Sequence, residues 1–292
     1  MNQKNREQLH HASVANNIEM FKKLMEQEIR KNKEGFHLIK FMNGGYKESD
    51  ENDYLTTLKK EELWVSSPLY FNDPFDCILN IDYRNEICEA TYSIASKLGF
   101  SKEQIKEHIA ERKEYSELEE ILNKSNNEEV TKCIFVSCFS EKSNIYSLVM
   151  WGHYAKNHTG ICVEYDYREM NKARLNKATI LPINYTDNRK TKHIANDDIH
   201  KNREFHLNIA FTKSTEWKYE KEWRLLEIND TDRKGKEGFN IPFIKPECIY
   251  LGCKIDERLK NDVIKLCDQK KIKVYQMRMV SGSFKLDMEK IL

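Results

Sequence analysis

The sequence has little net charge, no long apolar run and no apolar core in its first nine residues. Its 48 lysines and arginines are offset by 47 acidic residues, so the formal net charge is only +1. A chain without a basic excess has no bulk attraction to nucleic acid or to an anionic membrane. The longest uncharged stretch, residues 143–155, is too short and too polar to span a bilayer. Because the first nine residues have no apolar core, we expect a cytoplasmic protein.

The sequence also has no Cys-x-x-Cys pair among its eight cysteines. Cysteines in an unsecreted chain of this size are typical of free thiols, which pack as small apolar residues. The group of cysteines and histidines that comes closest to a zinc site has spacings that fit no known zinc pattern. It consists of Cys133, Cys138, His153, His158 and Cys162. We therefore predict free thiols and no metal.

Apolar and charged residues make up 39% and 33% of the chain, the balance of a folded globular protein. Near the N-terminus, apolar residues at helical spacing predict one amphipathic helix over residues 10–34, ended by Gly35. The apolar stripe consists of Val14, Ile18, Phe21, Met25 and Ile29. Its spacing resembles a short coiled-coil seam, so we expect it to bury against the core or against a second copy in a homodimer.

Short apolar segments between turn residues predict the strands of one sheet. They lie near residues 36–42, 63–67, 133–139, 161–166, 222–228, 248–253 and 273–279, with a further short strand at 181–185. Helical spacing covers most of residues 85–128. The order favours an α+β fold with one central mixed β-sheet. We predict an N-terminal helical extension (1–34) and a single domain (35–292) with a helical insertion at about 85–130.

Residues 216–228, EWKYEKEWRLLEI, carry many charges for a buried segment. In an extended strand, Glu220, Glu222 and Arg224 would point to one face. One interpretation is a structural ion-pair network in which Arg224 is the partner of the carboxylates. The other is a site in which a carboxylate handles a developing positive charge. Glu222 lies deeper in the strand than Glu220 and is the better candidate for that carboxylate.

Five phrases occur together in this chain: SSPLYFNDPFD, CFSE, MWGHYAKNHTGICVEYD, WKYEKEWRL and CIYLGCKI. On these phrases and their order, residues 36–280 resemble the bacterial family named domain of unknown function 2971. The resemblance implies a bacterial protein of that fold group. It implies no activity, so the chemistry has to be argued from the residues.

The order of Lys40, Ser66 and the pair Glu220 and Glu222 is similar in outline to that of ADP-ribosyltransferases. Those enzymes carry an arginine or histidine on the first strand, a serine motif on a second and a Glu-x-Glu on a late strand. The similarity implies that NAD is the substrate and that a carboxylate stabilises the oxocarbenium-like transition state as nicotinamide leaves. The early cation would hold the pyrophosphate or ribose, although Lys40 lacks the planar fork of arginine.

The predicted catalytic residues are therefore Glu222, Glu220 and Lys40. The predicted substrate-binding residues include rings that could stack on nicotinamide. They are Ser66, Tyr70, Asn72, Asp73, Tyr219, Arg224, Ser140 and His153. Asn72 and Asp73 also suit a turn before Pro74 that leaves Phe75 as a core anchor. The biological role implied by such chemistry is bacterial defence or a toxin.

Two other classes of function stay open. The first is a non-enzymatic module whose aromatic cleft binds a nucleotide, a peptide or a partner protein. The second is a magnesium- or manganese-dependent nuclease. Its ligands would be Asp73, Asp76, Glu141 and His153.

Overall fold

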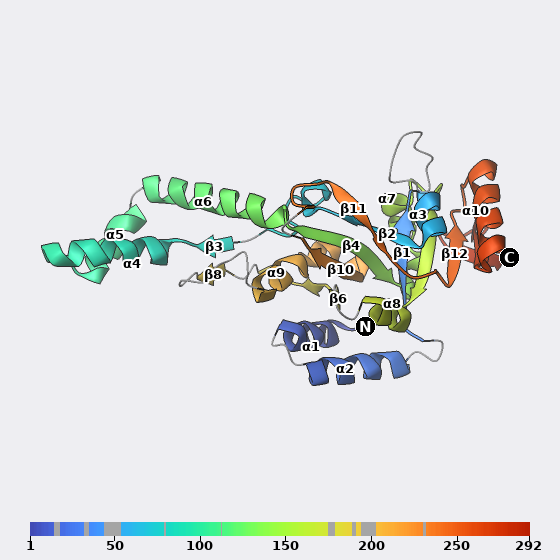
Figure 1. Ribbon diagram of the computed structural model, residues 1–292, viewed down its shortest axis with the longest axis horizontal. Helices are drawn as coiled ribbons and strands as arrows, with labels where there is room; N and C mark the ends of the chain where they lie inside the picture. The colour runs from blue at the N-terminus through green and yellow to red at the C-terminus, as the bar shows by residue number, and fades with distance from the viewer. Residues whose placement is uncertain are drawn as a thin grey trace.

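The chain folds around one large mixed sheet, as the α+β prediction requires (Figure 1). The computed structural model describes residues 1–14, 18–31, 35–43, 54–78, 80–111, 113–174, 179–188, 191–193, 203–229 and 232–292. The central sheet consists of β1 (His37–Met42), β2 (Glu62–Ser66), β4 (Ile134–Glu141), β5 (Ile161–Asp166), β6 (Thr179–Pro182), β10 (Glu222–Ile228), β11 (Gly238–Pro242), β12 (Cys248–Leu251), β13 (Lys273–Met279) and β14 (Leu286–Lys290). Pairing is antiparallel except between β12 and β13.

Strand β4 lies at the centre of the arrangement, and its two edges differ. β10 pairs along the whole of one edge. The other edge is shared, because β2 meets it at Val136 while β1 meets it at Ser140 and Glu141. β1 and β2 therefore diverge, and the gap between them lies beside Cys138.

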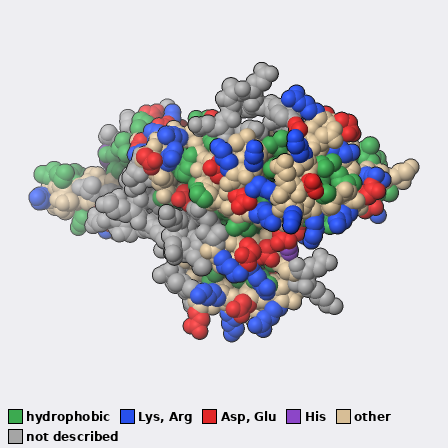
Figure 2. All heavy atoms as spheres, turned by 45° about the vertical axis from the view of Figure 1, so that its right-hand side comes forward, with side chains coloured by type: hydrophobic (Ala, Val, Ile, Leu, Met, Phe, Trp, Pro, Cys, Tyr) green, Lys and Arg blue, Asp and Glu red, His purple; other side chains and the backbone are tan. Residues whose placement is uncertain are grey.

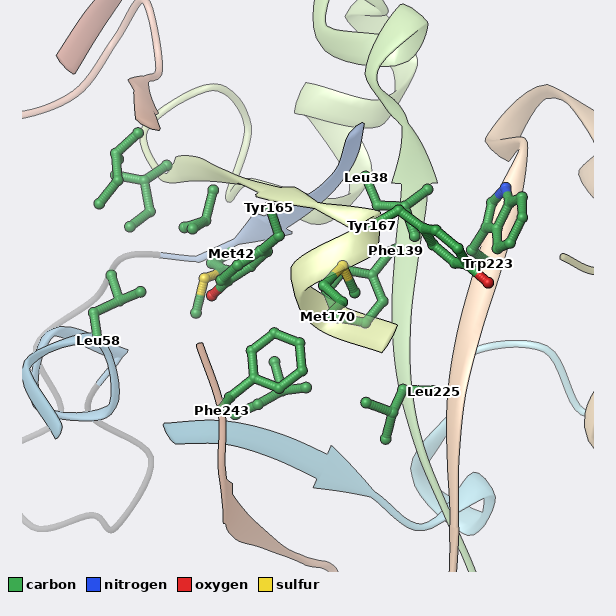
Figure 3. Close-up of a cluster of buried hydrophobic side chains, with 14 of the residues drawn as sticks. Leu38, Met42, Leu58, Phe139, Tyr165, Tyr167, Met170, Trp223, Leu225 and Phe243 are labelled. Atoms are coloured by element: carbon green, nitrogen blue, oxygen red, sulfur yellow. The ribbon is translucent and has the colours of Figure 1, made fainter. Parts of the chain in front are cut away.

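The two faces of the sheet differ in character. We call the first the core face, because Phe139, Trp223 and Leu225 lie there in the largest hydrophobic cluster (Figure 3). The helices that contribute to this cluster are α1 (Gln3–Val14), α2 (Ile18–Lys31), α3 (Tyr54–Lys60), α8 (Tyr167–Arg174) and α10 (Glu257–Lys270). Burial of this apolar surface is the main favourable contribution to folding.

The opposite face, which we call the polar face, carries Cys138 and Ser140 of β4 beside Arg224 and Glu222 of β10. Two smaller apolar clusters flank these residues on the same face. The helices α9 (Arg203–Ala210) and α7 (Leu148–Tyr154) each contribute to one of these clusters. The polar residues of β4 and β10 are therefore enclosed between two hydrophobic clusters.

Three helices project from one end of the sheet as an arm (Figure 1). They are α4 (Arg84–Ala95), α5 (Lys102–Glu111) and α6 (Lys113–Thr131), and they correspond to the predicted insertion. Short parallel pairs join β3 (Asn80–Asp82) to β8 (Thr191–His193) and β7 (Asn184–Tyr185) to β9 (Thr212–Lys213). None of the described helices combines the length and apolarity needed to cross a membrane.

Two segments differ from the sequence-based expectation. The single helix predicted over residues 10–34 is described as two helices, α1 and α2, and residues 15–17 and 32–34 lie outside the described part of the chain. Of the predicted apolar stripe, Met25 and Ile29 are buried on the core face and Phe21 packs against them. This part of the stripe is therefore buried within the chain.

The stretch 216–228 is extended only in its second half. Residues Thr215–Glu220 form a short 3-10 helix, η5, because the Ser214 hydroxyl accepts a hydrogen bond from the Glu216 amide, and Lys221 then turns the backbone with φ of 47°. The interpretation of residues 216–228 as extended throughout is wrong for this half, whereas the predicted strand at 222–228 matches β10. Glu220 lies beside Glu222 because of this turn and not because of strand alternation.

We predict that Met25→Ala lowers the free energy of unfolding by about 2–5 kcal/mol, because it leaves a cavity under α2. Met20→Ala on the same helix is the matched control, since Met20 is 37% exposed whereas Met25 is 4% exposed. Denaturant unfolding of both variants measures the difference. Equal, small losses for the two variants would show that α2 does not dock on the core face.

Candidate functional site

A cavity of about 370 Å³ opens on the polar face of the sheet. It is enclosed by β1, β4 and β10, by α7, by η5 and by the loop that follows β2. Its lining residues are Ile39, Lys40, Phe41, Tyr70, Phe71, Asn72, Asp76, Cys138, Phe139, Ser140, Met150, His153, Tyr154, Lys213, Glu220, Glu222 and Arg224. The volume falls in the range of small-molecule sites.

Arg224 is the centre of an ion-pair network in the cavity wall, and its side chain is fully buried. Nε donates to Glu222 Oε1 at 2.6 Å, and Nη2 donates to Asp76 Oδ2 at 2.5 Å and to Glu222 Oε2 at 3.2 Å. Nη1 donates to Asp76 Oδ1 at 2.7 Å and to the Ala210 carbonyl at 2.8 Å. These contacts use all five N–H groups of the guanidinium, so none is left for a ligand.

Lys213 of β9 is the second buried cation of the network. Its Nζ lies 2.7 Å from Glu220 Oε2, 3.2 Å from Glu222 Oε2 and 3.8 Å from Asp76 Oδ2. Burial opposes the charge of Lys213, but the surrounding carboxylates, Glu222 first, outweigh burial and raise its pKa. Lys213 is therefore a fixed ammonium that joins the carboxylates to one another.

Glu220 and Glu222 are both buried, yet their surroundings move their pKa values in opposite directions. Burial opposes ionisation of Glu222, but Arg224 and Lys213 outweigh it and lower the pKa of Glu222 to about 2. Burial and the charge of Glu222 raise the pKa of Glu220, which also accepts a hydrogen bond from the Tyr154 hydroxyl. A pair of carboxyl groups with separated pKa values is the arrangement that lets enzymes divide acid and base roles.

Lys40 reaches the cavity from β1, beside the gap between β1 and β2. Its Nζ donates to the Cys138 carbonyl at 3.2 Å and lies 5.5 Å from the centroid of the Phe139 ring. Among the described residues, no carboxylate lies within ion-pair distance of Lys40. Burial lowers the pKa of Lys40.

Aromatic rings stand at the cavity mouth. Tyr70, on the short helix Pro68–Tyr70, is 59% exposed and lines the cavity. The His153 ring, exposed on α7, lies 6.5 Å from the Tyr219 ring, which lies 6.2 Å from the ring of Trp217. Of these rings Tyr70 and His153 line the cavity, and exposed rings in such a position suit stacking on a planar ligand.

Most of the predicted site residues come together in this cavity. Those that line it are Lys40, Tyr70, Asn72, Ser140, His153, Glu220, Glu222 and Arg224. Ser66, Asp73 and Tyr219 are not among its lining residues. The Ser66 hydroxyl donates to the carbonyls of Ser67 and Glu237, both at 3.4 Å. Asp73 Oδ1 accepts from the Phe75 amide at 2.9 Å, as the turn prediction requires, but Phe75 is 68% exposed and is not a core anchor.

The sequence reasoning missed Lys213 and Tyr154 as site residues, and it considered Asp76 as a metal ligand or as a residue facing a site after the preceding strand. One signal for Lys213 was present, because two buried glutamates and one arginine leave an excess of negative charge that needs a second cation. Nothing in the local sequence distinguishes Lys213 from the other lysines of the chain.

The ligands expected for a metal-dependent nuclease do not converge. Asp76 is held by Arg224, whereas Glu141 pairs with Arg6 of α1. Arg6 Nη1 also donates a hydrogen bond to the main-chain oxygen of Glu222 at 2.8 Å. Helix α1 therefore contacts β10. Within the described ranges, no three histidine, cysteine or acidic residues form a group that could hold a metal ion. All eight cysteines are free thiols.

We predict that Arg224→Met lowers the free energy of unfolding by about 3–5 kcal/mol, because it leaves Asp76 and Glu222 buried without their main partner. The control is Arg278→Met on β13, where the arginine is 62% exposed and pairs with Glu289. Loss of that surface pair should change stability by less than about 1 kcal/mol. Denaturant midpoints of the two variants give the comparison, and similar values for both would contradict the network described above.

Comparison with known proteins finds one similarity, to a family model that covers part of this site. No curated protein and no solved structure matches the chain. The model of one family matches residues 150–225, the segment that runs from α7 into β10. That segment contains His153, Tyr154, Lys213, Glu220, Glu222 and Arg224 of the cavity. Residues 150–225 are thus similar to the family described as protein of unknown function (DUF2971).

Proposed function

We propose that the cavity cleaves the bond between nicotinamide and ribose in NAD, as an ADP-ribosyltransferase-like or NAD-hydrolysing enzyme. The observation that carries the proposal is the pair of unlike carboxyl groups in one cavity. Glu222 is held as an anion by Arg224 and Lys213, and Glu220 takes up a proton more readily. A role in bacterial defence or as a toxin is part of the same proposal.

The two carboxyl groups would act at different steps. As the C–N bond breaks, its electron pair moves to the nicotinamide nitrogen, and positive charge develops on the ribose. A fixed carboxylate near that charge stabilises the transition state, which is the role given to Glu222. Water or an acceptor then attacks the ribose carbon and loses a proton, and Glu220 is the base that receives it.

The shape of the cavity supports a substrate that is only partly enclosed. A volume of about 370 Å³ suits the nicotinamide-ribose half of a dinucleotide, with the remainder extending through the mouth. Tyr70 at the mouth can stack on a planar ring, and Lys40 can face the ribose or pyrophosphate.

A second candidate, a non-enzymatic nucleotide-binding module, is favoured by one observation. The donors of Arg224 are all used within the chain, and Glu222 accepts from both Arg224 and Lys213. The network is complete without a ligand, which is what a structural role requires. In this alternative the aromatic mouth binds a nucleotide and no bond is cleaved.

We predict that the wild-type protein releases nicotinamide from NAD and that Glu220→Gln lowers the rate by about 10²–10⁴, because the variant removes the general base. Glu222→Gln should lower it by about 10²–10³. Because Glu222 is part of the ion-pair network, each rate has to be read beside the unfolding midpoint of the same variant. Release is measured by chromatography, with and without protein acceptors.

The mouth offers a matched pair of control variants. Tyr70→Ala should weaken NAD binding, whereas Phe75→Ala should not, because both rings are exposed on the same loop and only Tyr70 lines the cavity. Saturable NAD binding without release of nicotinamide would support the binding module. If the protein neither binds NAD nor releases nicotinamide from it, NAD is not the ligand.

A further inference from the structure

Lys40, which is half-buried, differs from the two buried cations of the cavity. Arg224 and Lys213 are each surrounded by carboxylates. Lys40 has only the Cys138 carbonyl as a hydrogen-bond acceptor, at 3.2 Å, among the residues that the structure describes. Its other N–H bonds are therefore not committed to a counter-ion.

The divergence of β1 and β2 gives Lys40 its position. By strand alternation, Lys40 lies on the core face with Leu38 and Met42, which pack in the main hydrophobic cluster. Its nitrogen lies over the Phe139 ring and donates to the Cys138 carbonyl at the β4 edge, and the residue lines the cavity. These two contacts hold the nitrogen at the cavity wall.

A lysine held in this way has the chemistry of a nucleophile. Desolvation by burial disfavours the ammonium and lowers the pKa of Lys40, and the charges of Cys138 and Glu222 offset this only in part. The neutral amine attacks carbonyl carbons, and desolvated lysines serve this purpose in Schiff-base enzymes. Lys213 shows the opposite case in the same cavity, because its carboxylate partners raise its pKa.

We propose that Lys40 forms an imine with an aldehyde or ketone bound in the cavity, the ligand class being small sugars in their open-chain form. The inference does not depend on NAD cleavage. The lining is compatible with a small hydroxylated ligand, because it includes the Asn72 amide, the Tyr154 hydroxyl that donates to Glu220, and the exposed ring of Tyr70. If NAD is cleaved and hydrolysed here, the ribose that is left has such a carbonyl in its open-chain form.

The reaction balances without an oxidant or a reductant. The Lys40 nitrogen attacks the carbonyl carbon and forms a C–N bond, while a proton passes from nitrogen to the carbonyl oxygen. The C–O bond of this carbinolamine then breaks as its oxygen takes up a proton and leaves as water, and the resulting iminium returns its N–H proton to the group that donated, which leaves a C=N bond. Glu220 and Tyr154 line the same cavity and can donate the proton that the departing oxygen needs.

The test is reductive trapping on the intact chain. The protein is incubated with D-glyceraldehyde and sodium cyanoborohydride, which reduces an imine to a stable secondary amine, and modified lysines are mapped by peptide mass spectrometry. We expect Lys40 to be modified faster than Lys59, an exposed lysine of α3, and Lys213 to stay unmodified. Modification of Lys40 no faster than that of Lys59, or equal modification of Lys40 and Lys213, would overturn the proposal.

Competition then tests the ligand class. D-ribose should slow the modification of Lys40 without slowing that of Lys59, because only Lys40 lies in a cavity that holds the sugar. If D-ribose slows both equally or neither, a sugar is not the ligand. Nicotinamide release is measured in a separate assay, so a failure of this inference is distinguishable from a failure of the proposed NAD chemistry.

Discussion

The complete burial of one guanidinium is the constraint on which the rest of the site depends. Removing an ion from water costs several kcal/mol even after the protein relaxes, so Arg224 is compatible with the fold only if its partners are equally buried and well aligned. Asp76 comes from the loop after β2, Glu222 from β10 and the Ala210 carbonyl from the end of α9. Satisfying Arg224 therefore fixes three separate segments around the cavity.

The remaining properties of the cavity follow from this arrangement. Asp76 and Glu222 bring more negative charge than Arg224 neutralises once Glu220 is added, and Lys213 supplies the second cation. Glu220 lies next to a carboxylate that is already ionised, and its pKa is raised. Lys40 lies where β1 and β2 diverge, apart from the carboxylates that hold the other two cations. The groups available for chemistry are therefore Glu220, whose pKa is raised, and Lys40, which forms no ion pair with a described residue.

Much of the fold could be predicted from the sequence, because the sheet has one strongly apolar face and its strands are short segments between turns. The seven longer strands predicted from the pattern are present within a residue or two, the short strand predicted at 181–185 is divided between β6 and β7, and the helical arm lies where helical spacing indicated. The strands β11 and β14 were missed, since GFNIP and LDMEK carry too little apolar character to stand out. The turn at Lys221 was missed because no sequence pattern predicts that a lysine will adopt the left-handed backbone conformation with positive φ.

The candidate site was predicted only in part, because local sequence patterns place some of its residues and tertiary contacts place the others. Glu222 and Arg224 could be placed on one face because alternation along β10 is a local property. Lys213 could not be identified, because it approaches from a two-residue strand whose place depends on tertiary contacts. Ser66 is on the expected strand, but its hydroxyl bonds to the backbone at the edge where β2 leaves β4. Chain order alone therefore indicated the right strands but not which side chains meet.

Carboxyl ¹³C NMR of protein labelled at glutamate measures most directly whether the cavity holds two carboxyl groups with opposite pKa shifts. We expect one resonance, which belongs to Glu220 and is absent from Glu220→Gln, to titrate with a pKa above the ordinary glutamate value of about 4.3. We also expect a second resonance, assigned through Glu222→Gln, that stays ionised until the pH falls toward 2. Ordinary titration of both resonances would contradict the account.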